Sequence, residues 1–102
     1  MKEPDSVTGD EPPAMFHFRD EFFSRDDCYS IGIEEESGRH YLSIPVSNGI
    51  ADYEEYYELT ARQYTALLGD PRNARMFAQR CRRRERDDLL IQMPGSNRGT
   101  AV

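Results

Sequence analysis

The sequence predicts an α+β domain in which a small antiparallel sheet of three to four strands, at about 15–59, packs on two consecutive helices, at about 60–69 and 71–86. Apolar residues alternate with polar ones in the first half of the chain, which is the period of strands with one buried face. Strong helix-capping signals come only after that half. Strands first and helices afterwards is the order that gives an α+β fold rather than a parallel α/β sheet.

Residues 28–46 predict a β-hairpin. The runs CYSIGIE and HYLSIPV both alternate apolar with small or polar residues, and the EESGR between them contains a Ser-Gly turn signal. Pro45 cannot donate a backbone hydrogen bond, so we expect its position on an edge or facing away from the neighbouring strand. Before this hairpin, Phe16 and Phe18 in MFHFRDEFF predict a further short strand.

The stretch DYEEYYEL, residues 52–59, admits two interpretations. Its tyrosines and the apolar residues beyond them have the spacing of one long amphipathic helix. Against this, Thr60 and Gln63 form a capping box, with Leu59 and Tyr64 as the partners of a hydrophobic staple. A helix that begins at Thr60 leaves 52–59 as an aromatic-rich strand, and tyrosine prefers strands. We favour the strand.

The second helix is bounded by clear signals at its start. Gly69 is a natural end for the first helix, Asp70 caps the second, and Pro71 occupies its first turn. Its apolar stripe consists of Ala74, Phe77, Ala78 and Cys81. We expect this helix to end near Asp87, after which LLI forms a closing strand or a core plug.

The chain is expected to hold one domain, at 15–92. Residues 1–14 are rich in proline and acidic residues and predict a disordered tail. Residues 93–102 predict a C-terminal loop or a disordered tail, in which Arg98, next to Gly99, is a candidate anchor for a carboxylate of the acidic half. A core of this size is marginal, so docking on a partner or on a second copy would help it.

The expected core combines the alternating side chains of the strands with the apolar stripes of the helices. Its members are Phe18, Tyr29, Ile31, Ile33, Leu42, Ile44, Tyr57, Leu59, Tyr64, Leu67, Leu68, Phe77, Cys81 and Leu89. Cys28 and Cys81 lie in different elements without Cys-x-x-Cys spacing, which favours two reduced structural thiols over a disulfide.

Charge is separated along the chain. Residues 1–58 hold fifteen acidic and four basic residues, whereas residues 59–102 hold four acidic residues and nine arginines, within an overall charge of −6. Carboxylates beside tyrosines are typical of a surface that attracts a basic protein partner. The residues expected to make this contact are Glu34, Glu35, Glu36, Tyr53, Glu54, Glu55 and Tyr56.

The arginines between residues 80 and 86 suggest an alternative, a nucleic-acid accessory protein. In that case Arg75, Arg82, Arg83 and Arg86 would bind phosphates. The sequence pI of about 4.8 and the lack of any nucleic-acid-binding motif make this less favoured than a solvated or internally paired arginine face. A third possibility is a homodimer in which the two oppositely charged halves of separate copies meet.

Catalytic, metal and cofactor sites are not expected. His17, His40 and Cys28 lack the close ligand spacing of a zinc site, and a Cys–His pair cannot be inferred from sequence alone. SRDDCYSIGIEEE does not fit the calcium-loop pattern, and PGSNRG is not a phosphate-binding loop. The absence of a long apolar run and of a secretory signal favours a cytoplasmic protein without a membrane segment.

In size, acidity and strand–helix order the chain resembles the small bacterial immunity proteins that neutralise toxins. The resemblance is one of class, because no family motif assigns roles to particular residues. It implies a non-enzymatic binding module that engages a basic protein, such as a nuclease, through the acidic and aromatic residues named above.

Overall fold

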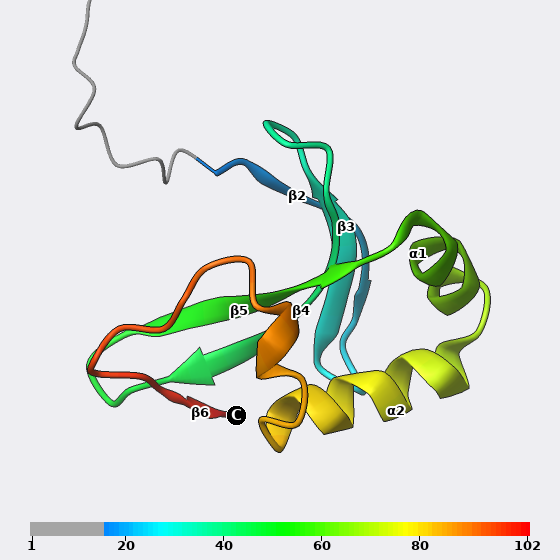
Figure 1. The fold of residues 1–102 in the computed structure, drawn as a ribbon. Helices are drawn as coiled ribbons and strands as arrows, with labels where there is room; N and C mark the ends of the chain where they lie inside the picture. Colours follow the sequence, from blue (N-terminus) through cyan, green and yellow to red (C-terminus); the bar gives the residue numbers. More distant parts are fainter. Residues whose placement is uncertain (1–15) are drawn as a thin grey trace, which may run out of the picture.

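The computed structural model describes residues 16–102 and has the predicted α+β class (Figure 1). The strands are β2 (Phe18–Ser24), β3 (Tyr29–Glu34), β4 (His40–Ser47), β5 (Asp52–Leu59) and β6 (Thr100–Ala101), and the helices are α1 (Ala61–Leu68), α2 (Pro71–Arg82) and the 3-10 turn η1 (Asp87–Leu89). Residues 52–59 form a strand, as favoured. The disordered tail expected at 1–14 lies outside the described residues.

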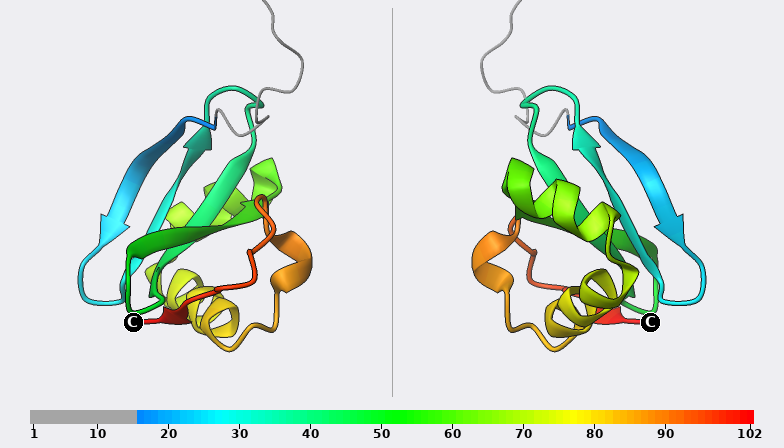
Figure 2. Two further views of the ribbon diagram at one scale, coloured as in Figure 1. Left: turned by 90° about the vertical axis from the view of Figure 1, so that its left-hand side faces the viewer. Right: turned by 90° about the vertical axis from the view of Figure 1, so that its right-hand side faces the viewer.

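The sheet is antiparallel, with strand order β2-β3-β4-β5, and β6 pairs with β4 beside Val46 and Ser47. Both helices pack on the same side of this sheet, where they share one core (Figures 1 and 2). The opposite side of the sheet is called the helix-free face below. No helix of the described part of the chain covers it.

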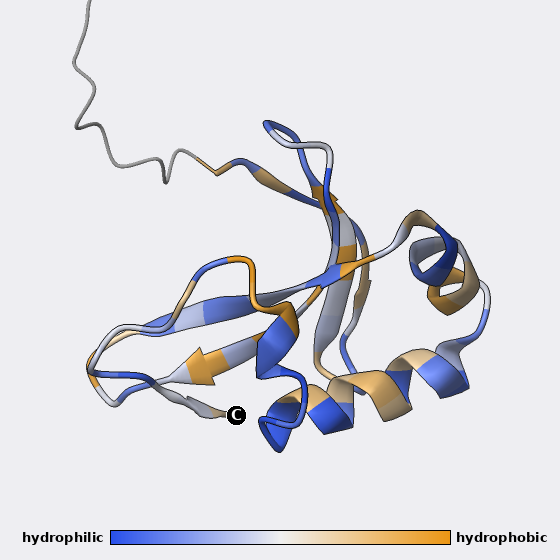
Figure 3. Ribbon diagram, in the orientation of Figure 1, coloured by the Kyte–Doolittle hydropathy of each residue, from blue (hydrophilic) through white to orange (hydrophobic). Residues whose placement is uncertain are grey.

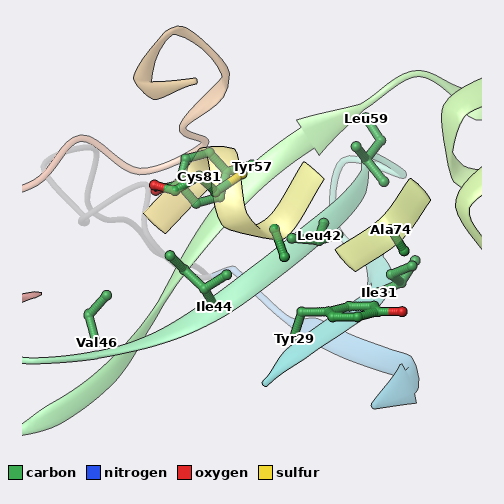
Figure 4. Close-up of a cluster of buried hydrophobic side chains, with 10 residues drawn as sticks. Tyr29, Ile31, Leu42, Ile44, Val46, Tyr57, Leu59, Ala74 and Cys81 are labelled. Carbon is green, nitrogen blue, oxygen red and sulfur yellow. The ribbon is translucent and has the colours of Figure 1, made fainter. Parts of the chain in front are cut away.

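The core lies between the sheet and α2. Side chains from β3, β4 and β5 point toward the helix, which presents Ala74, Ala78 and Cys81 to them (Figure 4). Small residues on α2 let the helix approach the larger strand side chains closely, and Figure 3 shows its apolar and polar stripes. Burial raises the pKa of the Cys81 thiol to about 12, and Cys28 and Cys81 are both free, as expected of structural thiols.

Helix α1 begins where the capping signals predict. The Thr60 hydroxyl accepts a hydrogen bond from the Gln63 N–H at 3.0 Å, and the Gln63 side chain accepts one from the Thr60 N–H at 2.8 Å. Asp70 caps α2 in the same way, through the Asn73 N–H, with Pro71 in the first turn. The start of each helix is therefore encoded locally.

The end of α2 differs from the prediction. The helix stops at Arg82 rather than at residue 86 because Arg84 adopts a left-handed conformation, with φ of 61°. The Glu85 N–H bonds to the Arg80 carbonyl and the Arg84 N–H to the Cys81 carbonyl, which is the Schellman termination. Glycine usually fills the left-handed position, so an arginine there gives no sequence signal.

Several expected core residues are less buried than predicted. Leu68 is 38% exposed, and Phe18 lies on the helix-free face. Ile33, Tyr64, Leu67, Phe77 and Leu89 are only partly buried. Four buried hydrophobic residues were not named in the predicted core: Tyr41, Val46, and the two alanines Ala74 and Ala78 of the predicted helical stripe.

Of the two alternatives predicted for 93–102, a loop or a disordered tail, the structure shows the loop, which ends in a short strand that was not predicted. The segment returns along β5 and ends in β6 on β4 (Figure 1). Arg98 holds it there: its guanidinium donates two hydrogen bonds to Glu55, at 2.7 and 3.0 Å, and two to Asp87, at 2.8 and 3.0 Å. The side chains of Arg98 and Glu55 are 14% and 7% exposed. Arg98 therefore anchors a carboxylate of the acidic half, as the sequence suggested.

Glu34 organises the turn between β3 and β4 and is fully buried. Its carboxylate accepts hydrogen bonds from the N–H groups of His17, Glu36 and Ser37 and from the Ser37 hydroxyl, at 2.6–3.0 Å. Burial alone would raise the pKa of Glu34, but these hydrogen bonds outweigh it and lower the pKa to about 2.

Removing Arg98 should destabilise the fold strongly. The substitution Arg98→Ala leaves Glu55 buried without its cation, which typically costs about 3–5 kcal/mol. The matched control is Arg83→Ala, which breaks only the exposed pair with Glu85 and should cost less than about 1 kcal/mol. Urea unfolding of both variants measures the difference, and equal midpoints would contradict the role given to Arg98.

Glu34 should make the stability depend on acid. Its pKa is lower in the folded than in the unfolded chain, so its contribution is complete above the ordinary value of 4.5 and is lost as pH falls toward about 2. The difference in unfolding free energy between wild type and Glu34→Gln should therefore shrink between about pH 6 and about pH 3. Glu36→Gln, at an exposed position, should keep the wild-type pH profile. A pH-independent Glu34→Gln difference would refute this account.

Candidate functional site

The helix-free face carries a cluster of aromatic rings that the curvature of the sheet brings together. Phe18 on β2 and Tyr56 on β5 come from the two outer strands, yet their rings stack with centroids 3.5 Å apart and an interplanar angle of 8°. Tyr41 on β4 meets both rings edge-on, at 5.4 and 4.9 Å, and is fully buried. The sheet therefore curls around this cluster, which fixes the positions of its side chains.

Gly32 on β3 makes this arrangement possible. A Cβ atom added at this position would lie 2.5 Å from the Tyr41 Oη and would also clash with the Arg19 carbonyl. Only glycine lets the Tyr41 ring cross the adjacent strand at this distance. The glycine in CYSIGIE thus serves a close approach rather than a turn.

Two carboxylates border the aromatic cluster. Asp20 on β2 accepts a hydrogen bond from the Tyr41 hydroxyl at 2.5 Å. Glu54 on β5 is half-buried, and its pKa is raised above the ordinary value, mainly by burial. The Ser43 hydroxyl lowers this pKa and the nearby charge of Asp20 raises it, so the net shift is upward. Ser43 Oγ is buried and makes no hydrogen bond of ordinary geometry to any residue in 16–102.

Neither of these carboxylates has a cationic partner within the described chain. Among residues 16–102, no salt bridge reaches Asp20 or Glu54. Glu55, the next residue along β5, is by contrast held by Arg98. Consecutive strand residues point to opposite faces, so Glu55 meets the C-terminal segment while Glu54 shares the face of Asp20 and Tyr56. Burial of a carboxylate without a cation is costly, which makes Glu54 unusual.

A groove lies beside this cluster, between β5 and residues 92–97, with a volume of about 560 Å³. It is called the β5 groove below. The Ile91 N–H bonds to the Tyr56 carbonyl at 2.9 Å at one end, and the Asn48 side chain bonds to the Asn97 carbonyl at 3.3 Å at the other. Between these two hydrogen bonds, residues 92–97 lie apart from β5 (Figure 1). Among residues 16–102, the charged side chains that line the groove are Glu54 and Glu55.

The structure divides the seven predicted contact residues into three groups. Tyr53, Glu54 and Tyr56 line the β5 groove, and the Tyr53 hydroxyl accepts a hydrogen bond from the Gly99 N–H at 2.6 Å. Glu35 and Glu36 are exposed at the β3–β4 turn, outside the groove, and pair with Arg19 and His17.

Glu34 and Glu55 form the third group and are corrections. Both are buried and already accept hydrogen bonds from the chain itself, Glu34 in its turn and Glu55 from Arg98 and from the Tyr57 hydroxyl. Their carboxylates are therefore not available to contact a partner. Asp20 was missed, because its place on the helix-free face depends on the β2–β3 register, which pairs it with Gly32.

The arginines of the alternative phosphate site are largely engaged by the chain. Arg82 donates to the carbonyls of Asp27 and Cys28, Arg83 pairs with Glu85, and Arg86 pairs with Asp88 and lies 5.9 Å from the centre of the Phe77 ring. Arg75 is exposed and has no salt bridge within residues 16–102. The arginine face is thus mostly paired internally.

The residues considered for catalysis or metal binding do not meet. His17 Nδ1 lies 3.0 Å from a Glu36 oxygen, His40 packs against Tyr64, and the Cys28 thiol faces the Arg25 carbonyl in the turn before β3. Within residues 16–102, no group of three or more His, Cys, Asp or Glu side chains is placed to hold a metal ion. The helices of that range are all too short or too polar to cross a membrane.

Comparison with known proteins gives no relative from which a role could be transferred. No protein-family model, no curated protein and no solved structure matches the chain significantly. The site is therefore interpreted from its own chemistry.

Proposed function

We propose that this protein is a non-enzymatic binding module that engages a basic protein partner through the β5 groove and the adjoining Asp20, Glu54 and Tyr56. The proposal places the protein in the same functional class as the small immunity proteins that neutralise toxins. The observation that carries it is the half-buried Glu54 carboxylate, which has no cation within the described chain.

The energetic argument concerns desolvation. A carboxylate on an open surface must lose its hydration when a partner arrives, and that loss offsets much of the attraction. Glu54 is already half-buried in the free protein, and its charge is disfavoured there by burial and by Asp20. A guanidinium or ammonium group of a partner would relieve both effects, so this position favours a cation more than the exposed acids do.

The aromatic residues support the same interpretation. Tyr56 is held by its stack on Phe18, and Tyr53 is fixed through its hydroxyl, so both rings offer contact area without losing freedom on binding. Tyrosine is enriched at protein interfaces for this reason, and arginine stacks well on aromatic rings. A basic side chain at Glu54 would lie beside such a ring.

The two alternatives have weaker support. Phosphate binding by the arginine face would require Arg82, Arg83 and Arg86 to give up partners within the chain. Self-association is favoured by one observation, the outer strand β2, on which Phe22 and Phe23 are 42% and 59% exposed. Sedimentation at two ionic strengths would detect a second copy, and a pair formed through β2 would leave the β5 groove open.

The contact set can be tested without knowing the natural partner. A library of random short peptides is selected against the protein, and the affinities of the recovered peptides are measured by fluorescence anisotropy. We expect recurrent arginine or lysine in these peptides, and weaker binding at higher salt. Glu54→Gln should weaken binding about ten-fold, equivalent to about 1.4 kcal/mol. Asp20→Asn, which keeps an acceptor for the Tyr41 hydroxyl, should act in the same direction.

The matched control is Glu58→Gln, which removes the same charge from an exposed position on the same strand. Its effect should be less than about two-fold, because an exposed charge contributes little. Folding is checked by thermal unfolding. Since the folded state disfavours the charge of Glu54, Glu54→Gln should unfold at the same temperature as wild type or a higher one. Equal losses in the two variants, or no basic residues among selected peptides, would reject the proposed function.

A further inference from the structure

The outer edge of β5 presents unused backbone hydrogen-bonding groups to the β5 groove. The Tyr56 carbonyl points away from β4, because it accepts the hydrogen bond from the Ile91 N–H. Backbone groups alternate in direction along a strand, so those of Glu54 and Asp52 point outward as well, while those of Tyr53 and Glu55 point toward β4. Within residues 16–102, these outward N–H and C=O groups of Glu54 and Asp52 have no hydrogen-bond partner.

This open edge results from the path of the C-terminal segment. Residues 90 and 91 pair with β5 as a neighbouring strand would, through the Tyr57–Leu90 bridge and the Ile91–Tyr56 bond. After residue 91 the chain leaves β5, and its next hydrogen bond is the one that the Asn97 carbonyl accepts from the Asn48 side chain. A stretch of unpaired strand edge therefore lies in the β5 groove, whose volume of about 560 Å³ is within the range of pockets that hold ligands.

The charge of the groove restricts what can occupy this edge. Both charged side chains in its lining are acidic, and of these two Arg98 pairs with Glu55 and not with Glu54. A strand added beside Glu54 would direct every second side chain toward the helix-free face, where Glu54 and Asp20 have no salt bridge to any residue of 16–102. A basic residue is favoured at those positions, and an acidic one is disfavoured by like-charge repulsion.

We propose that the β5 groove holds a short extended segment of the basic partner as an additional strand on β5. The main chain of the segment bonds to the N–H and C=O groups of Glu54, and a basic side chain on alternate residues reaches Glu54 and Asp20. Strand addition of this kind takes its affinity from the main chain and its specificity from alternate side chains. The inference rests on the proposed function and specifies how the partner is bound.

The test uses a basic peptide selected from the library described above, resynthesised with one N-methyl group at each position in turn. Methylation removes a single main-chain donor and leaves the side chains and the charge unchanged. Strand addition predicts losses of about ten-fold or more at every second position within the bound segment and little effect between them. Uniform tolerance to methylation would overturn the inference.

Variants of the protein give an independent readout. Glu54→Pro and Glu54→Ala both remove the carboxylate, but only proline also removes the outward N–H, which no bond to β4 uses. The Glu54→Pro variant should therefore bind the peptide several-fold more weakly than the Glu54→Ala variant, with the β4–β5 pairing retained in hydrogen exchange. If Glu54→Pro unfolds, the methylation series decides alone.

The outcomes separate the two proposals. If Glu54→Gln weakens binding while N-methylation has no alternating effect, the basic partner is bound by side chains only, and strand addition is wrong. If the library yields no basic peptide, the proposed function and the inference both fail.

Discussion

The contact of Arg98 with Glu55 and Asp87 determines most of what is unusual in this protein. It joins three segments that are far apart in the sequence, the strand β5, the turn η1 and the C-terminal segment. By fixing the C-terminal segment beside β5, it builds the far wall of the β5 groove. Because the arginine is almost buried, its geometry is constrained by four hydrogen bonds rather than by a loose surface attraction.

The acidic residues of the described chain fall into compensated and uncompensated groups. The charge of Glu34 is stabilised by hydrogen bonds from its own turn and from the His17 N–H, and that of Glu55 by Arg98. Glu54 is half-buried beside Asp20 and has no such partner within residues 16–102. A natural protein that keeps a disfavoured charge gives up stability at that position, which is typical of sites where function rather than folding selects the residue. This contrast between Glu54 and the other carboxylates, more than the net charge of −6, identifies Glu54 as the candidate contact residue.

The sequence predicted the parts of the fold that depend on local signals. The hairpin alternation and the caps at Thr60 and Asp70 correctly placed the strands and the helix starts, because neighbouring residues alone determine these features. The end of α2 was missed, since its left-handed residue is Arg84 rather than glycine. The C-terminal strand was also missed: its two residues have no pattern, and its position depends on distant contacts of Arg98.

The same distinction holds for the candidate site. Tyr53, Glu54 and Tyr56 were identified from a run of acids and tyrosines, but whether a carboxylate is free or engaged depends on tertiary partners that no run reveals. Glu34 and Glu55 lie in the same kind of acidic run as Glu54. In the structure, however, both are buried and bonded to other groups of the chain. The linear separation of charge was also a poor guide to the surface, because Arg82 and Arg98 cross from the basic half to groups of the acidic half.

The Glu54 carboxylate has no cationic partner within residues 16–102, and we propose that a binding partner supplies one. An NMR titration of the glutamate side chains measures this directly, first in the free protein and then with a bound basic peptide. The account predicts that the pKa of Glu54 in the free protein lies above that of an exposed glutamate and falls below it when the peptide binds. A pKa for Glu54 that is already low in the free protein, or that does not move on binding, would contradict it.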